Sequence, residues 1–318
     1  NAAIQDVILE VEESYYLYVN ARALAQAEAT SVKEAEASLD AAETRRRAGL
    51  GTIADVLQAK TVLSRARLAL ETAEGEVSTI RGALATAMGL PANTGFDVTL
   101  PPLEPPKDDV AVEIERALRE AQERRPDLAA ARAEVERAEA DLRARSASDR
   151  PSLNLVGSGG QSYYWLTGLH QNVYNTSLVL TIPIFNGLTY HYNVFKAEAD
   201  RDVARARLAA LEQDVTLQVW TSYYRHRTAV QKVATSGDLL ESAAQGFEVV
   251  SARYRAGVGS ILDLLTAQSA LEGARAEQTR GRTEWYLTLA QLAHDTGALA
   301  TPVAEPAHSP GSGAEGTP

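Results

Sequence analysis

Two carboxylates at matching positions of a repeated turn are the residues best placed for chemistry. Asp55 lies in RAGLGTIADVLQA, residues 47–59, and Asp263 lies in RAGVGSILDLLTA, residues 255–267. The segments share eight of thirteen residues at an offset of 208 positions. The first glycine of each can take the left-handed conformation that ends a helix, and the following Thr or Ser can cap the next helix. The acid then stands at the third helical position, where it can complete a capping box.

Other site chemistry finds no support in the sequence. The five histidines are scattered without metal-ligand spacing, Cys is absent, and no phosphate-binding loop of the G-x-x-x-x-G-K type occurs. The sequence therefore predicts no catalytic residue, no metal site and no cofactor. A formal net charge of −11 argues against a nucleic-acid partner, which requires clustered Lys and Arg. Because no run of 18 apolar residues occurs, no transmembrane helix is predicted.

The 208-residue offset extends beyond the turn and holds without a gap over some 80 residues. Ser14-Tyr15-Tyr16 falls on Ser222-Tyr223-Tyr224, for example. The chain thus contains two copies of a helix–turn–helix hairpin. Patterns with few or no breakers predict long helices over residues 7–47, 52–88, 189–255 and 261–296, and shorter helices are expected over 108–123 and from residue 126. Hairpins this long need neighbours from the same chain or from identical subunits to bury their apolar faces.

Residues 151–185 have the pattern of a strand pair. From 173 to 184 the side chains alternate, so that one face is mostly apolar and the other is mixed. A partner strand is expected over 153–165, with the loop LTGLHQN at 166–172. Strands of this length cross a bilayer when tilted, and the aromatic residues near both ends, Tyr163 to Trp165 and Phe185, suit the interfaces of a membrane barrel. The alternative is a soluble hairpin packed on the helices.

Six segments follow from these patterns. We expect a first long hairpin at 1–90, a linker with a short helix at 91–125, a helix leading to the strands at 126–150, the strand pair at 151–185, a second long hairpin at 186–298 and a disordered tail at 299–318. Subtracting 208 places a second strand pair before residue 1, so we expect a longer precursor with an export signal. Two such units fit a tube, an α-helical barrel continued by a closed β-barrel.

The chain resembles the TolC family of outer-membrane efflux proteins. The shared motifs are the paired RAGxGxxxDxL turns, RPDLAAARAEVERAEADL at 125–142, RPSLNLVGSGG at 150–160 and LTIPIFNGLTY at 180–190. The resemblance implies a mainly α fold, in which long antiparallel hairpins form an α-barrel and the β-hairpin contributes to a transmembrane β-barrel in a homotrimer. It implies an outer-membrane duct that extends into the periplasm and belongs to a tripartite efflux or secretion system. The implied partners are a periplasmic adaptor, an inner-membrane transporter and outer-membrane lipid, and no enzymatic activity is expected.

The resemblance also assigns roles to the turns. Tyr254 and Asp263 match residues of the family's periplasmic gate. Asp55 would line the same mouth, and the two acids of each of three subunits would form a cation-selective ring. Gly259 stands where the family has an Arg, and Thr266 where it has a second acid, so the closing bonds must differ here. The arginines at the two helix ends are candidate replacements, although they also suit the negative end of the helix dipole without any further role (Arg45, Arg46, Arg47, Arg253 and Arg255).

The tips of the same turns match the family's docking sites for the adaptor. The expected contacts are Gly49, Leu50, Gly51, Gly257, Val258 and Gly259.

Two alternatives to a passive duct remain at this point. The first alternative is a soluble coiled-coil spacer. The second is a periplasmic adaptor, a kind of protein that also carries a long helical hairpin. An adaptor has one hairpin between β-rich halves, whereas this chain repeats the hairpin and has little other β structure. A spacer leaves the alternating strands with aromatic ends unexplained.

Overall fold

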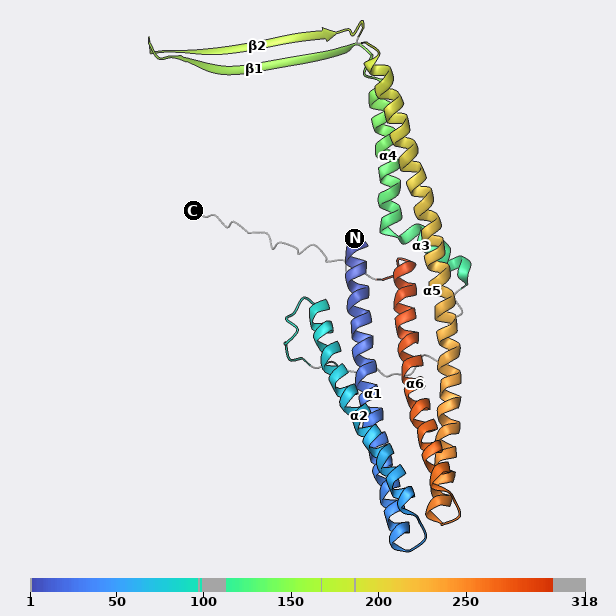
Figure 1. The fold of residues 1–318 in the computed structure, drawn as a ribbon. Helices are drawn as coiled ribbons and strands as arrows, with labels where there is room; N and C mark the ends of the chain where they lie inside the picture. The colour runs from blue at the N-terminus through green and yellow to red at the C-terminus, as the bar shows by residue number, and fades with distance from the viewer. Residues whose placement is uncertain (1, 97, 99–112, 167, 186, 300–318) are drawn as a thin grey trace, which may run out of the picture. The chain divides into compact units, whose positions relative to one another are not determined.

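A computed structural model describes residues 2–96, 98, 113–166, 168–185 and 187–299 (Figure 1). The elements are α1 (Ala2–Arg47), α2 (Ile53–Ala87), α3 (Ile114–Arg124), α4 (Pro126–Ser146), β1 (Ser152–Tyr164), β2 (Leu169–Thr181), α5 (Thr189–Arg255) and α6 (Ile261–Asp295). Nearly all of the expected tail, most of the expected linker and the expected start of the short helix at 108 lie outside the described residues. The chain divides into two units, residues 1–126 with 215–318, and residues 127–214.

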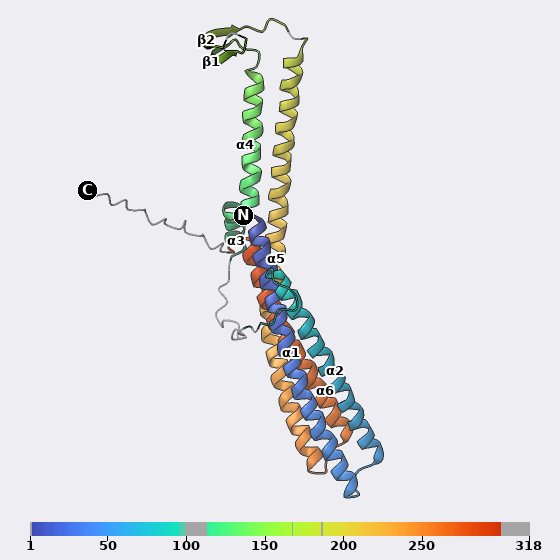
Figure 2. The ribbon, with the colours of Figure 1, turned by 90° about the vertical axis from the view of Figure 1, so that its left-hand side faces the viewer.

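In the first unit the two long hairpins lie side by side. Helix α1 lies between α2 and α6, and α5 lies on the far side of α6 (Figures 1 and 2). The turns that join α1 to α2 and α5 to α6 lie at the same end of this unit. The helices therefore lie in the order α2, α1, α6 and α5. In the sequence repeat, α1 corresponds to α5 and α2 corresponds to α6.

Small apolar residues form the seam between α1 and α2. Ala35 packs against Leu63 and Ala66 halfway along the hairpin. Near the turns the same seam widens into a core shared by all four helices, formed by Ala42, Val56, Ala59, Tyr254, Ile261 and Leu264. Alanine at these positions lets helix axes approach closely, because interaxial distance follows the size of the side chains at the contact.

The seam between α1 and α6 is polar. Ser38 donates to Gln268 Oε1 at 3.1 Å, and both side chains are buried. One turn further from the tips, the Arg275 guanidinium donates two hydrogen bonds of 2.7 and 2.8 Å to the Glu34 carboxylate. Among the described residues, no buried side-chain nitrogen or oxygen lacks a partner. Since Gln268 Oε1 and the Arg275–Glu34 pair meet their partners across the two helices only in this alignment, the seam fixes the register of one hairpin against the other.

The second unit combines two antiparallel helix segments and the strand pair. Helix α4 lies along the first part of α5, where Arg205 reaches Glu139 at 2.6 Å. Strands β1 and β2 are antiparallel over their whole length, with Ser152 opposite Thr181 and Tyr164 opposite Leu169. The loop predicted at 166–172 is wrong in its extent, because β2 begins at Leu169 and residues 169–172 pair with residues 161–164 of β1. The side chains of residues 170–172 are polar, which is typical of a loop. In the structure these residues pair with Gln161, Ser162 and Tyr163 of β1.

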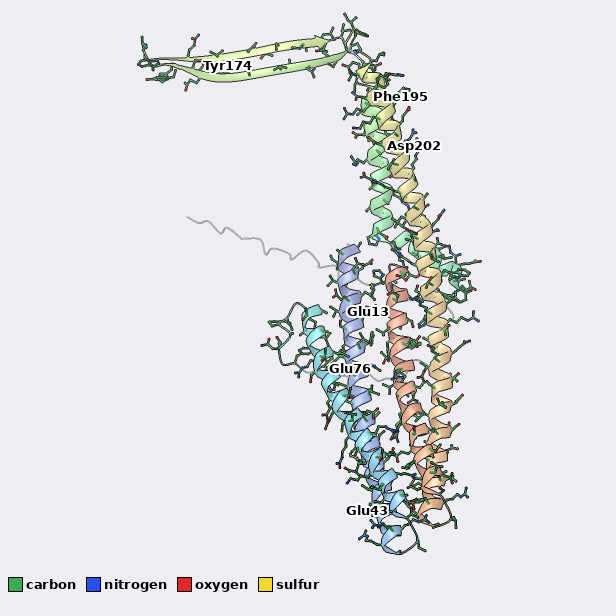
Figure 3. The ribbon with its side chains drawn as sticks, in the orientation of Figure 1. Glu13, Glu43, Glu76, Tyr174, Phe195 and Asp202 are labelled. Atoms are coloured by element: carbon green, nitrogen blue, oxygen red, sulfur yellow. The ribbon has the colours of Figure 1, made fainter. Side chains whose placement is uncertain are left out.

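The predicted alternation divides the strand pair into two faces. One face carries apolar side chains that are 60–79% exposed, and Tyr174 projects from it (Figure 3), covering Gly159 with its ring. These side chains are Leu153, Leu155, Tyr174, Leu178 and Leu180. The opposite face is mostly Ser, Asn, Gln and Thr, with a few Val. Between Arg150 and Lys196 the chain has no Asp, Glu, Lys or Arg.

Candidate gate at the paired turns

The two turns close their helices in the same way. Gly49 and Gly257 have φ of +76° and +85°, the left-handed region that glycine enters at little cost. In the first turn, Leu50 N–H donates to Arg45 O at 2.9 Å, and Gly49 N–H donates to Arg46 O at 3.0 Å. The second turn repeats both bonds at 3.0 and 3.1 Å. These are Schellman motifs, so the glycine prediction is confirmed and the two turns present nearly the same backbone.

The caps that follow the turns differ. Thr52 and Asp55 form the predicted capping box, with Asp55 N–H donating to Thr52 Oγ1 at 3.2 Å and Thr52 N–H donating to Asp55 Oδ2 at 2.8 Å. Ser260 instead accepts from Leu262 N–H at 3.2 Å. In the described part of the chain, Asp263 makes no hydrogen bond or ion pair, so the box predicted for it is wrong. Asp55 is therefore held by its cap, whereas the Asp263 carboxylate stays outside the cap of its helix.

Arg45 joins the first hairpin to the second turn. Its Nη1 donates to Tyr254 O at 2.9 Å and to Gly259 O at 3.3 Å, and its Nη2 reaches Leu50 O at 3.5 Å. The guanidinium also lies over the Tyr254 ring, 4.5 Å from its centre. A single side chain from the end of α1 thereby fastens the two turns together.

Gly259 has its own steric reason to be glycine. A Cβ added there would lie 2.9 Å from Tyr254 N and 3.1 Å from Arg253 C, which are backbone atoms that cannot move aside. The larger side chain that the resemblance would place here does not fit this turn. The guanidinium beside Gly259 is instead supplied by Arg45, one of the candidate replacements named from the sequence.

Tyr254 is buried where the turns meet, at 3% exposure. Burial raises the pKa of its hydroxyl above the ordinary value; the Arg45 charge acts the other way, and the Asp55 carboxylate adds to the rise. The structure thus brings Tyr254, Arg45 and Asp55 into one electrostatic neighbourhood. Asp263 is exposed and does not take part in it.

The tips of both turns are exposed and apolar. Leu50 and Val258 stand at equivalent positions of the two turns and are 69% and 70% exposed. The flanking glycines add no side chain, so each tip presents one apolar residue on an otherwise bare backbone.

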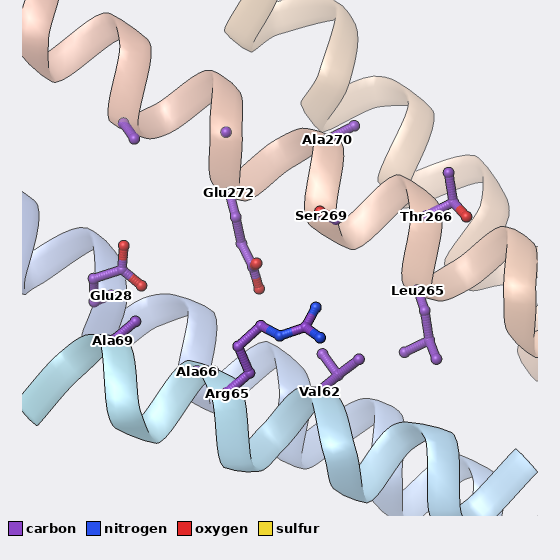
Figure 4. A pocket seen from close by; sticks show the side chains of 12 residues that line it. Glu28, Val62, Arg65, Ala66, Ala69, Leu265, Thr266, Ser269, Ala270 and Glu272 are labelled. Carbon is purple, nitrogen blue, oxygen red and sulfur yellow. The ribbon is translucent and has the colours of Figure 1, made fainter.

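Sequence reasoning missed a charged groove further up the hairpins. Glu28 of α1, Arg65 of α2 and Glu272 of α6 point into it from three helices (Figure 4), and its volume is about 660 Å³. Burial raises the pKa of Glu28, and burial also raises that of Glu272, with Glu28 and Glu34 adding to the rise. No local motif marks these residues, since the position equivalent to Glu272 in the first copy is Ser64.

Two negative findings apply to the described residues. None of the helices in the described ranges is both long enough and apolar enough to cross a membrane. The same ranges hold no group of three or more His, Asp or Glu side chains arranged to bind a metal ion.

Comparison with known proteins gives a consistent result. The family model described as "Outer membrane efflux protein" matches residues 1–90 and 117–298. Protein CyaE of Bordetella pertussis is 31% identical over 278 residues, which is 86% of this chain and 58% of CyaE. Outer membrane protein OprJ of Pseudomonas aeruginosa is 29% identical, covering 82% of this chain and 55% of OprJ. The chain therefore spans somewhat more than half the length of these relatives.

Solved structures share the same fold. The outer-membrane channel OprN superposes with a TM-score of 0.79 at 19% identity, over 93% of this chain and 68% of OprN. The expected fold of long helical hairpins with a strand pair and the expected outer-membrane location are confirmed, whereas the spacer and adaptor alternatives gain no support. The matched residues cover most of the chain on both sides of the short linker, and the chain belongs to the outer membrane efflux protein family.

Proposed function

We propose that this chain forms part of a passive export duct in the outer membrane. In this proposal an inner-membrane pump delivers substrates through a periplasmic adaptor, and the duct carries them out of the cell. The observation that carries the proposal is the strand pair, in which a 60–79% exposed apolar face of Leu and Tyr lies opposite a polar one on an uncharged ribbon. Lipid on one side and water on the other is the environment such a ribbon suits.

The proposed assembly is a homotrimer. Two hairpins per chain, at 1–90 and 186–298, supply twelve helices for an α-barrel in the periplasm. The strand pair at 151–185 joins the strands of the other subunits, and a closed barrel removes the edges that β1 and β2 leave unpaired. A duct of this kind needs no catalytic group, which agrees with the proposal that the protein is not an enzyme.

We place the gate at the joined turns. Arg45 and Tyr254 hold the second turn against the first hairpin with Asp55 close by, and in three subunits this contact would narrow the periplasmic mouth. Asp263, which has no partner among the described residues, faces the mouth in this proposal and contributes to a ring of carboxylates that favours cations. Leaving Asp263 out of its cap keeps its charge available to that ring.

The adaptor docks at the tips. Leu50 and Val258 supply apolar contacts, and the glycines beside them allow close approach of the adaptor's backbone. The pairs Gly49 with Gly51, and Gly257 with Gly259, frame these two side chains. Because Arg45 fixes one turn relative to the other, both tips are presented together, and an adaptor that separates them would also open the gate.

Electron microscopy of the full-length protein, extracted from outer membranes in detergent, tests the proposal. We expect a three-fold tube with a short barrel at one end and the two glycine turns at the far tip. A variant with Leu155→Asp and Leu178→Asp on the apolar strand face should fail to insert, whereas Ser158→Asp on the opposite face should be tolerated. A rod without a lumen, or a wild-type protein found only in the soluble fraction, would refute the duct.

A further inference from the structure

The repeat places Arg253 at the position of Arg45, 208 residues later. Arg45 donates to two backbone carbonyls of the neighbouring hairpin. Arg253 is exposed at the end of α5, and within the described chain it makes no hydrogen bond or ion pair. The same side chain on nearly the same turn is therefore bonded in one copy and unbonded in the other.

Burial differs between the copies along one stripe of the second helices. Ile261 and Gln268 of α6 are 7% and 0% exposed, and they face α1. Their counterparts on α2, Ile53 and Lys60, are exposed. Positions that face the partner within a hairpin are buried in both copies, as at Leu271 and its counterpart Leu63. The exposed stripe of α2 is thus the face that α6 uses against α1.

The first helices show the same difference. Ser31 and Ser38 of α1 are buried, whereas their counterparts Leu239 and Gly246 of α5 are exposed. With Arg253 the exposed positions recur every seven residues, which is the spacing of a coiled-coil seam. One stripe on α5 and one on α2 are therefore uncovered, and each has the spacing of a seam already made inside the chain.

These stripes fit each other in a second copy of the chain. The contact of α1 with α6 joins the first helix of one hairpin to the second helix of the other. Because α5 corresponds to α1 and α2 corresponds to α6, the same contact made between two copies joins α5 of one copy to α2 of the next. We propose that Arg253 of one copy donates to the backbone carbonyls of Arg46 and Gly51 in the first turn of a second copy, as Arg45 does to those of Tyr254 and Gly259 in its own chain. The inference rests on the proposed closed ring and adds the residues that fasten it.

The acceptors needed for these bonds are present. Both turns are Schellman motifs with the glycine at closely similar φ, so the carbonyls stand in the same positions relative to their helix ends. The charges along the stripes do not oppose the contact. Arg67 of α2 takes the place of Arg275, pairs with Glu36 of its own chain at 2.8 Å and would face the neutral Ser242. The proposed ring thus has two alternating sets of bonds, which we call latches. Arg45 bonds the two hairpins within each chain, and Arg253 bonds one chain to the next.

Thiol cross-linking tests the register, because the chain has no Cys of its own. Lys60→Cys with Gly246→Cys reproduces in two copies the pair that Ser38 and Gln268 form in one. A short bifunctional thiol reagent, applied to the full-length protein in outer-membrane vesicles, should give dimer and trimer bands on a denaturing gel. Ser38→Cys with Gln268→Cys should react only within one chain.

A matched control tests which face of α5 is used. Lys60→Cys with Glu248→Cys places the second thiol at nearly the same height but about 200° around the helix, and it should give no ladder. Equal ladders from Gly246→Cys and Glu248→Cys would overturn the proposed register.

Channel recordings test the latch itself. Loss of a hydrogen bond to a charged donor shifts an equilibrium about tenfold, so Arg253→Ala should raise the open fraction by about that factor. Arg255→Ala, two residues away on another face, should leave the open fraction unchanged. If the three-fold tube is present but the Lys60–Gly246 pair gives no ladder, or Arg253→Ala behaves like Arg255→Ala, the latch is wrong and the duct stands. If the tube is missing, the proposed function fails first.

Discussion

Replacement of Arg45 by Ala tests whether one side chain holds the two turns together. The change removes a 2.9 Å hydrogen bond to Tyr254 O, a longer bond of 3.3 Å to Gly259 O, and a guanidinium 4.5 Å from the Tyr254 ring centre. A bond from a charged donor contributes about 1.5–3 kcal/mol. Arg45 is only half-buried, so we take the lower end and add about 0.5 kcal/mol for the ring contact. We do not count the longer bond separately, because it uses the same nitrogen.

The sum of about 2 kcal/mol corresponds to about a 30-fold shift between joined and separated turns. Single-channel recording of the full-length protein in planar bilayers measures it, and Arg45→Ala should spend correspondingly more time open. Arg45→Lys keeps the charge but loses the planar stacking, so it should fall between the wild type and Ala.

The matched control is Arg47→Ala. Arg47 lies in the same last turn of α1 and, among the residues that the structure describes, bonds only to Thr44 Oγ1, at 3.1 Å, so its removal should leave the gate unchanged. If Arg45→Ala and Arg47→Ala give the same open fraction, the bonds of Arg45 do not restrain the mouth and the proposed gate is wrong.

Three further changes have defined outcomes. Asp55→Asn should destabilise the start of α2 by about 1 kcal/mol because its carboxylate closes the box with Thr52, and Asp263→Asn should stay within about 0.5 kcal/mol; amide hydrogen exchange at the two helix starts compares them. Gly259→Ala should cost about 1–3 kcal/mol through its 2.9 Å backbone clash, and an unchanged thermal midpoint would contradict the steric argument. The pKa of His294 is raised, chiefly by its bond to a neighbouring buried carboxylate, so its contribution is complete below the unfolded pKa and is lost as pH rises through the folded value. The thermal midpoint should therefore fall from pH 6 to pH 8.5, and His294→Asn should flatten that dependence.

Local chemistry made the helix ends predictable. Gly49 and Gly257, with the cap residues that follow, define where each long helix ends and the next begins, and the last helix expected over 261–296 is observed as Ile261–Asp295. The strand faces were predictable for the same reason, since alternation at period two places every second side chain on one side. These features depend on residues a few positions apart.

Contacts between distant segments were not predictable from such patterns. Arg45 and its acceptors Tyr254 and Gly259 are 209 and 214 positions apart, and several arginines near the turns looked equally suitable. The groove formed by Glu28 and Glu272 depends on the way three helices pack. Local reasoning also failed where two solutions compete at one helix start: Ser260 bonds to Leu262 N–H, which leaves Asp263 outside the cap.

The two copies of the hairpin have diverged where their neighbours differ. Inside the chain Gln268 is fully buried, and a neutral amide is satisfied there by Ser38 and Glu272. The equivalent residue on the outer stripe is the exposed Lys60. A lysine buried in the inner seam would need an anion to offset its desolvation, whereas on the outer stripe it stays hydrated until a second copy arrives. In the proposed ring, the charge of Lys60 thus keeps the outer stripe hydrated before assembly, whereas the neutral Gln268 lets the hairpins of one chain pair first.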